Sequence, residues 1–250
     1  MNRLAPAISL MPRPRPPRPA TGFPSLPWAA VPPGPVARRQ RPASAYRGKA
    51  TLDFLAAVVL IVLTAPAVIF AGMLVGLTSR GPAIYSQRRL GRGGRPFVMY
   101  KLRTMRHECE RDTGPTWAVP NDPRVTPVGR VLRRFHLDEL PQLWNVLRGE
   151  MSLIGPRPER PEISAKLRLL VPGYDRRLDV KPGVTGLAQV YLPPDSDVDG
   201  VWKKIAHDRL YAARFGLGFD LKILVFTALK VLGLRRFYDG TNADATTRRR

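Results

Sequence analysis

The sequence predicts a mainly helical α+β protein that is held at a membrane. Three observations support this: an apolar run at 54–79 without an ionisable side chain, a short segment typical of a β-hairpin, and helical patterns over much of the remaining chain. Among 250 residues, 41 are Lys or Arg and 19 are Asp or Glu, which gives a formal net charge of +22. That charge favours polyanionic partners: nucleic acid, an anionic membrane surface or phosphorylated substrates.

Both ends of the chain are basic and differ in composition from its middle. Residues 1–49 form a Pro- and Arg-rich arm without an acid, and residues 235–250 form a basic C-terminal tail. The arm buries too little apolar surface to offset its conformational entropy, so we expect it to be disordered. The single cysteine, Cys109, excludes an intramolecular disulfide and fits a reducing, cytosol-facing location.

The apolar segment at 50–80 is long enough to cross a bilayer. As a helix, 54–79 would measure roughly 39 Å at 1.5 Å per residue, against a hydrocarbon thickness of about 30 Å. Arg47 and Lys49 precede it and several arginines follow it, so the preference of basic flanks for the cytoplasm gives no orientation. Pro66 removes one helical hydrogen bond and predicts a bend. Two alternatives stay open: a kinked single-pass anchor, favoured by hydropathy alone, and a helix that bends and returns.

The residues after the apolar segment predict a hairpin and several helices. A turn at Gly91–Gly94 lies between two short alternating runs, which is typical of a β-hairpin. Residues 125–147 carry an amphipathic helical pattern that we expect to break at Pro141, just after Asp138 and Glu139. Further helices are predicted near residues 162–171, 201–215 and 217–232.

The adjacent carboxylates of Asp138 and Glu139 are the candidate catalytic centre. A surface pair of carboxylates that forms ion pairs with nearby arginines would have the same sequence pattern. However, a broken helix, a cationic neighbourhood and an upstream apolar segment suit phosphate chemistry at a bilayer. An ionised aspartate, with a reference pKa near 4, can attack phosphorus without a base. A diphosphate donor repels a carboxylate, so we expect Mg²⁺, bound by the two acids, and the cations Lys101, Arg133 and Arg157 to neutralise it. Two prolines fix the backbone around Arg157, which suits a bidentate grip on phosphate.

Four sequence blocks carry a specific resemblance. The run LDELPQLWNVLRGEMSLIGPRPE, with QRRLGRGGRPFVMYKLRTM before it and KPGVTGLAQV and DLKILVFTALKVL after it, resembles the bacterial sugar transferases of the monotopic phosphoglycosyl transferase family, in a short form. The blocks agree in order and spacing over residues 50–234. The resemblance implies a re-entrant helix hairpin at 50–80 and amphipathic helices that seat a catalytic domain, 81–234. This domain would lie on the cytoplasmic face of the cell inner membrane or plasma membrane.

The resemblance also implies a reaction. A sugar 1-phosphate would pass from a nucleoside-diphosphate sugar, expected to be a UDP-sugar, to polyprenyl (undecaprenyl) phosphate, with release of the nucleoside monophosphate. This is the initiating step of exopolysaccharide or other surface glycan synthesis. Asp138 would form a covalent phosphosugar ester with Glu139 as its partner, and Mg²⁺ would be required. The implied substrate-binding residues are Lys101, Arg133, Arg157 and, from the resemblance alone, Asp208.

Departures from the family pattern and rival functions limit these expectations. His136, Leu210 and the loop at 191–200 differ from the common pattern, so the transferred sugar stays open. A membrane-tethered nucleic-acid binder would explain the charge but neither the two carboxylates nor the apolar run, so we expect no nucleic-acid partner. A non-enzymatic assembly subunit would require the carboxylates to be replaceable. Membrane lipids are expected partners, and a homodimer stays open.

Overall fold

The longest element is α1 (Ala43–Thr78), a continuous helix that carries the apolar segment. This computed structural model describes residues 43–111, 122–192 and 198–234, so most of the expected N-terminal arm and the C-terminal tail lie outside the described residues. The helix begins before the predicted boundary at residue 50. Its part Tyr46–Thr78 is the one helix in the described ranges that is long and apolar enough to cross a membrane.

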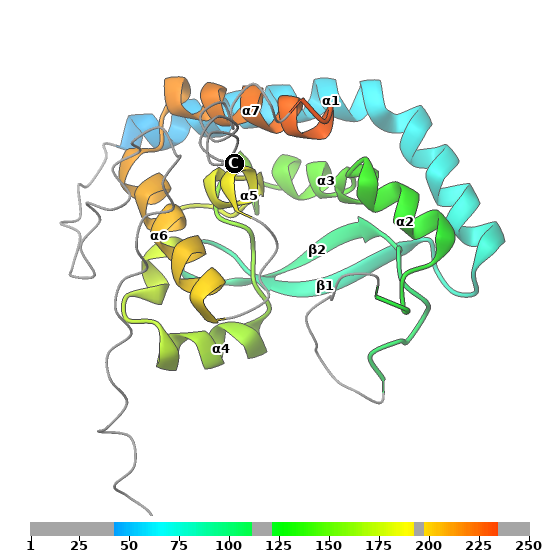
Figure 1. Cartoon of the computed structure of the whole chain (residues 1–250). Coiled ribbons are helices and arrows are strands. Elements are labelled where there is room, and N and C mark those ends of the chain that lie inside the picture. The colour runs from blue at the N-terminus through cyan, green and yellow to red at the C-terminus, as the bar shows by residue number, and fades with distance from the viewer. Residues whose placement is uncertain (1–42, 112–121, 193–197, 235–250) are drawn as a thin grey trace, which may run out of the picture.

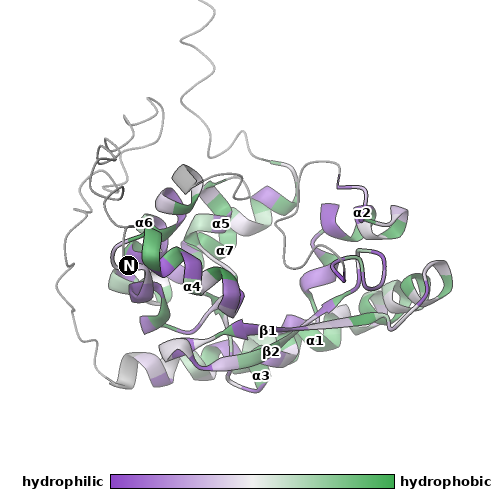
Figure 2. Ribbon diagram, turned by 90° about the horizontal axis from the view of Figure 1, so that it is seen from below, coloured by the Kyte–Doolittle hydropathy of each residue, from purple (hydrophilic) through white to green (hydrophobic). Residues whose placement is uncertain are grey.

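The helix α1 is bent and mostly apolar on its surface. Figure 1 shows it running along the top of the molecule and turning downward at one end, and Pro66 within it is the expected cause of the bend. Figure 2 shows hydrophobic colour along much of its length. Many of its large apolar side chains are exposed, including Leu55, Val59, Val62, Leu63, Ile69, Phe70 and Leu77.

Both ends of α1 are fastened to the rest of the described chain. Near its start, the Nζ atom of Lys49 lies 2.7 Å from Oδ2 of Asp220. Near its end, Val75 is buried in an apolar cluster with Leu102 and Leu132. The two ends of the apolar helix therefore contact the same folded unit.

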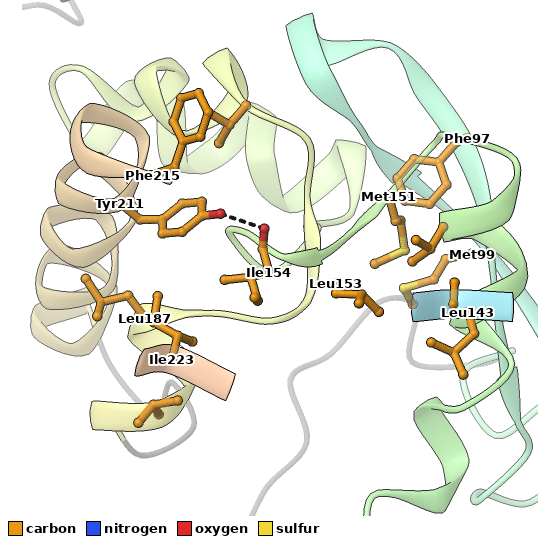
Figure 3. Close-up of a cluster of buried hydrophobic side chains, with 14 of the residues drawn as sticks. Phe97, Met99, Leu143, Met151, Leu153, Ile154, Leu187, Tyr211, Phe215 and Ile223 are labelled. Carbon is orange, nitrogen blue, oxygen red and sulfur yellow. Dashed lines mark hydrogen bonds between the residues drawn. The ribbon is translucent and has the colours of Figure 1, made fainter. Parts of the chain in front are cut away.

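The predicted hairpin follows α1 and is confirmed. Strands β1 (Ile84–Leu90) and β2 (Pro96–Leu102) are antiparallel, and the tight turn η2 (Arg92–Gly94) joins them. Phe97 and Met99 of β2 point into the main apolar cluster, where Figure 3 shows them beside Met151 and Leu143. The hairpin thus has one buried and one more exposed face, which explains the alternation in its sequence.

The predicted amphipathic helix at 125–147 is two helices. α2 (Pro127–Arg134) and α3 (Gln142–Leu147) are separated by the short 3₁₀ turn η3 (Leu137–Glu139). The expected break at Pro141 was wrong in position, because α2 already ends before the two carboxylates. The cause is His136, whose φ of 55° lies in the left-handed region that an α-helix cannot contain.

The remaining elements complete the core around the loop after residue 154. The helices predicted near 162–171, 201–215 and 217–232 are confirmed, whereas two short strands, which pair in parallel, and the helix α5 were not predicted. Figure 1 shows α4 on the opposite side of the molecule from α1 and α7. In chain order the elements are β3 (Ser152–Ile154), α4 (Pro161–Leu170), η4 (Tyr174–Asp179), β4 (Gly183–Thr185), α5 (Leu187–Tyr191), α6 (Val198–Arg214) and α7 (Leu217–Val231).

A buried tyrosine ties α6 to the centre of the core. The hydroxyl of Tyr211 lies 2.8 Å from the carbonyl oxygen of Ile154, to which it donates (Figure 3), and 2.9 Å from Oδ1 of Asp220. Tyr211 is 1% exposed, and it packs in the apolar cluster that contains Phe215 and Leu187. Because a buried hydroxyl without partners is costly, these two bonds fix the end of β3 relative to α6 and α7.

Candidate active site

The turn that carries the two carboxylates is positioned by α2. The side chain of Thr126 caps this helix by accepting a hydrogen bond from the amide of Gly129 at 2.9 Å. Gly129 lies against the main chain of Thr104, where any side chain at 129 would clash with the Thr104 carbonyl. The close approach brings the end of α2, and with it Asp138 and Glu139, next to strand β2.

Glu139 is held by two cations. Atom Nη2 of Arg157 lies 2.5 Å from its Oε1 and Nη1 lies 3.3 Å from its Oε2, so the contact is bidentate. The Nζ atom of Lys101 lies 2.9 Å from the same Oε1. Burial alone would raise the pKa of Glu139, but Arg157 and Lys101 hold it well below its usual range. Glu139 is therefore ionised and fixed in place.

Asp138 is buried beside the ion pairs of Glu139 but does not take part in them. The residue is 6% exposed, and no hydrogen bond or ion pair joins its carboxylate to another part of the described chain. Burial, and next the charge of Glu139, raise the pKa of Asp138 above its ordinary value, while Lys101, Arg133 and Arg157 oppose this rise. The carboxylate thus lies among cations with its oxygens uncommitted.

Arg133 reaches the same place from the last turn of α2. Its Nε donates to the side-chain oxygen of Thr104 at 2.8 Å, which orients the guanidinium. Its charge is one of those that lower the pKa of Asp138. Sequence reasoning missed Thr104, although it follows Lys101 by three positions in a block that already carried the resemblance.

The loop that carries Arg157 leaves β3 and is closely packed. The Gly155 amide donates to the Thr185 carbonyl at 2.9 Å, and the Gly183 amide donates to the Pro156 carbonyl at 2.9 Å. A side chain at Gly155 would clash with the backbone of the neighbouring segment, so glycine is needed for this close approach. The main chain before Arg157 is therefore fixed on both sides.

Asp208 lies apart from the two carboxylates. Its Oδ2 is 2.8 Å from Nη2 of Arg177, and both side chains are only 2% exposed. Burial raises the pKa of Asp208, and Arg177 opposes this rise. The structure thus brings Lys101, Arg133 and Arg157 around the dyad of Asp138 and Glu139 but places Asp208 behind the Arg157 loop. Direct contact between Asp208 and a substrate stays a prediction.

The acids fit a magnesium ion that arrives with a phosphorylated substrate. Mg²⁺ prefers oxygen ligands and is commonly bound by one or two carboxylates together with substrate phosphates. No cluster of three or more His, Cys, Asp or Glu side chains occurs in the described ranges, so a closed protein cage is absent there. Asp138 offers uncommitted oxygens, whereas both oxygens of Glu139 already contact Arg157. Asp138 is thus the better ligand, with Glu139 beside it.

Comparison with known proteins decides the family. The family model of the bacterial sugar transferases matches residues 44–234, nearly the whole described chain. The protein belongs to this family. The match confirms the family predicted from the four sequence blocks, and it includes every candidate site residue.

Individual relatives of the chain support the family match. Over 184 residues the chain is 41% identical to the UDP-N-acetylgalactosamine-undecaprenyl-phosphate N-acetylgalactosaminephosphotransferase of Aeromonas hydrophila, covering 74% of this chain and 43% of the relative. It is 44% identical over 188 residues to the UDP-glucose:undecaprenyl-phosphate glucose-1-phosphate transferase of Caulobacter vibrioides, covering 74% and 69%. It is 36% identical over 189 residues to the exopolysaccharide production protein PSS of Rhizobium leguminosarum, covering 74% and 94%. The chain therefore spans less than half of the Aeromonas relative.

Proposed function

We propose that this protein transfers a sugar 1-phosphate from a UDP-sugar to undecaprenyl phosphate and so initiates the synthesis of an exopolysaccharide or another surface glycan. The observation that carries the proposal is the uncommitted, buried carboxylate of Asp138 among the three cations Lys101, Arg133 and Arg157. The Aeromonas and Caulobacter relatives are named for this reaction with two different sugars, which leaves the sugar of this chain to experiment.

The reaction has two displacement steps at one phosphorus atom. A carboxylate oxygen of Asp138 attacks the phosphorus that bears the sugar, the phosphoanhydride bond breaks, and uridine monophosphate leaves with the bonding electrons. An oxygen of the lipid phosphate then attacks the same phosphorus and expels the Asp138 carboxylate, which forms polyprenyl-diphosphate sugar. No proton is gained or lost at Asp138, so an ionised carboxylate suffices for both steps.

The side chains around Asp138 have separate tasks in this mechanism. Lys101, Arg133 and Arg157 reduce the repulsion between the donor diphosphate and the attacking carboxylate. Glu139 fixes Lys101 and Arg157 by its ion pairs, so their charges are in place before the donor binds. Asp138, with Glu139 beside it, would hold magnesium, which would supply further neutralisation of the diphosphate.

The membrane arrangement that fits this reaction is a re-entrant helix, with the catalytic residues on the cytoplasmic face. A straight crossing of α1 would separate its ends by about 30 Å of hydrocarbon. Yet Lys49 near one end and Val75 near the other both contact the catalytic domain. The bend at Pro66 and the basic residues on both flanks support the same arrangement.

Direct assay of product tests the proposed reaction. The full chain in lipid nanodiscs with Mg²⁺ receives undecaprenyl phosphate and, in turn, each of several UDP-sugars. We expect one or more sugars to give a lipid diphosphate-sugar of the corresponding mass and an equal amount of uridine monophosphate. Absence of lipid product with every UDP-sugar, although the protein is folded, would rule out the proposed donor class.

Cysteine labelling tests the arrangement in the membrane. Gly48 and Ser86 lie on the two sides of the apolar segment. A side chain added at Gly48 would meet open space, and Ser86 is exposed. In a Cys109→Ala background, Gly48→Cys and Ser86→Cys should both resist an impermeant thiol reagent outside intact cells. Both should react after the membrane is permeabilised. Labelling of one of them from outside would establish a single crossing instead.

A further inference from the structure

We propose that Arg177 and Asp208 are positioning residues that fix the main chain at Arg157, and that neither contacts a substrate. The proposal rests on the proposed function, because it takes Arg157 as a group that grips the donor. It replaces the direct substrate contact that family resemblance implied for Asp208.

Arg177 is the centre of a buried polar network beneath the Arg157 loop. Its Nη2 donates to the main-chain carbonyl of Arg157 at 2.6 Å and lies 2.8 Å from Oδ2 of Asp208. Its Nη1 donates to the hydroxyl of Tyr174 at 3.0 Å. That hydroxyl lies 3.0 Å from the side-chain oxygen of Ser164. The guanidinium therefore contacts Tyr174 of η4 and Asp208 of α6 while it binds the Arg157 loop, and Ser164 of α4 supports the Tyr174 hydroxyl.

These contacts act on the backbone of Arg157 and leave its side chain free to point the other way. The side chain of Arg157 is 36% exposed and reaches Glu139, whereas its carbonyl points to the buried Arg177. Prolines on both sides of Arg157 restrict the backbone, and the Pro156 carbonyl is bonded to Gly183. A shift of the Arg157 carbonyl would therefore be transmitted to the guanidinium that faces the dyad.

The chemistry of the pair fits a fixed support better than a ligand site. A buried charged pair whose side chains are 2% exposed offers almost no surface to a sugar or a phosphate. A guanidinium can bind a carboxylate and a carbonyl oxygen at once because its five N–H donors lie in one plane. Lysine keeps the charge but cannot reproduce this planar set, so Arg177→Lys should loosen the loop while it retains a cation opposite Asp208.

A purely structural role and a positioning role differ in one measurable respect. If Arg177 acts through Arg157, its substitution should matter only while the Arg157 side chain is present. If it only stabilises the fold, its substitution should weaken donor binding equally with and without that side chain. A matched control is Arg168 of α4, which forms an exposed 2.7 Å ion pair with Asp175 of η4, the element that contains Tyr174 and Arg177.

A double-mutant cycle on donor affinity makes this distinction. All proteins are full chains in nanodiscs that carry Asp138→Asn, so that bound UDP-sugar is not consumed. Arg177→Lys should weaken UDP-sugar binding by roughly tenfold when Arg157 is present and by less than about twofold when Arg157→Ala is also present. Arg168→Lys should change neither value. Equal losses from Arg177→Lys in both backgrounds would overturn the positioning role.

Three further outcomes keep the test decisive. If Arg177→Lys does not fold, the cycle is repeated with Tyr174→Phe, which removes one contact of the guanidinium, and equal losses in both backgrounds again overturn the inference. If no UDP-sugar binds either the protein that carries Asp138→Asn alone or the wild-type protein, the proposed function fails and the inference fails with it. If the donor binds, and Arg157→Ala weakens binding but Arg177→Lys does not, only the inference fails.

Discussion

Two buried aspartates, in the turn η3 and in helix α6, show how differently this protein uses the same group. Asp138 is 6% exposed and Asp208 is 1% exposed, and burial raises the pKa of both. Asp208 is closed off in a 2.8 Å ion pair with Arg177. Asp138 has no bonded partner in the described ranges, although three cations lie near it. Burial and a raised pKa are therefore common to both aspartates, and the absence of an ion pair is what distinguishes Asp138, the proposed nucleophile.

Among substitutions of the two aspartates, we expect the largest loss of turnover for Asp138→Asn. Asparagine has the same shape but is a far weaker nucleophile, so turnover should fall by roughly a thousandfold or more. The thermal midpoint should stay close to that of the unchanged protein, because no ion pair is lost. Turnover is read from release of uridine monophosphate, and stability from thermal unfolding in detergent. Retention of substantial turnover would remove Asp138 from the catalytic step.

The opposite pattern is expected for Asp208→Asn. Breaking a buried pair leaves the charge of Arg177 without its counterion, which should lower the free energy of unfolding by about 3–5 kcal/mol. Asp175→Asn is the matched control, because its pair with Arg168 is exposed and should change stability by less than about 1 kcal/mol. Denaturant unfolding in detergent measures both. If Asp208→Asn is as stable as Asp175→Asn, the buried pair of Arg177 and Asp208 does not stabilise the fold.

Variants of Arg157 separate the effect of the planar shape of the guanidinium from the effect of its charge. Arg157→Ala removes both a charge and a bidentate donor, and we expect it to lower kcat/KM by roughly a hundredfold. Arg157→Lys keeps a point charge and should lose only about tenfold, because part of the interaction remains. Steady-state kinetics with varied UDP-sugar give both values. Equal losses for the two variants would mean that the planar geometry of the guanidinium carries the whole effect.

The pH dependence of activity should follow Asp138 and not Glu139. Attack requires the ionised form, and the raised pKa of Asp138 places the acid limb of kcat/KM above the ordinary aspartate value. The lowered pKa of Glu139 keeps that group charged across this limb. Because the charge of Lys101 lowers the pKa of Asp138, Lys101→Met should move the limb of the residual activity to higher pH. The exposed Lys166→Met should not move it, and a limb unchanged by Lys101→Met would contradict this coupling.

Local sequence patterns predicted a large part of this fold. The length and apolarity of α1, the alternation and glycines of the hairpin, and the helical pattern of α4, α6 and α7 all depend on residues near one another in the chain. The adjacent carboxylates and the cations around them were also identified, because the family blocks place them at fixed spacings. The bend of α1 was expected from Pro66 alone.

Features that depend on distant contacts were not predicted. The left-handed conformation of His136 ends α2 early, and no local rule requires it for a histidine. The ion pairs of Glu139 with Lys101 and Arg157 join strand β2, the turn η3 and the Arg157 loop. They form only because these three segments pack together in the folded protein. Arg177 stands in a stretch with several other charged residues and no distinguishing pattern, so its burial and its bond to the Arg157 loop required the folded structure.

The proposed two-step mechanism is tested most directly by a search for the covalent intermediate. Wild-type protein in nanodiscs is given a UDP-sugar and Mg²⁺ without lipid acceptor, quenched, digested and measured by mass spectrometry. The account predicts that the peptide containing Asp138 gains the mass of one sugar phosphate, that Asp138→Asn abolishes this gain, and that undecaprenyl phosphate discharges it. An unmodified peptide in wild-type protein, together with initial rates that fit a ternary complex, would contradict the two-step mechanism and leave Asp138 as a metal ligand for direct transfer.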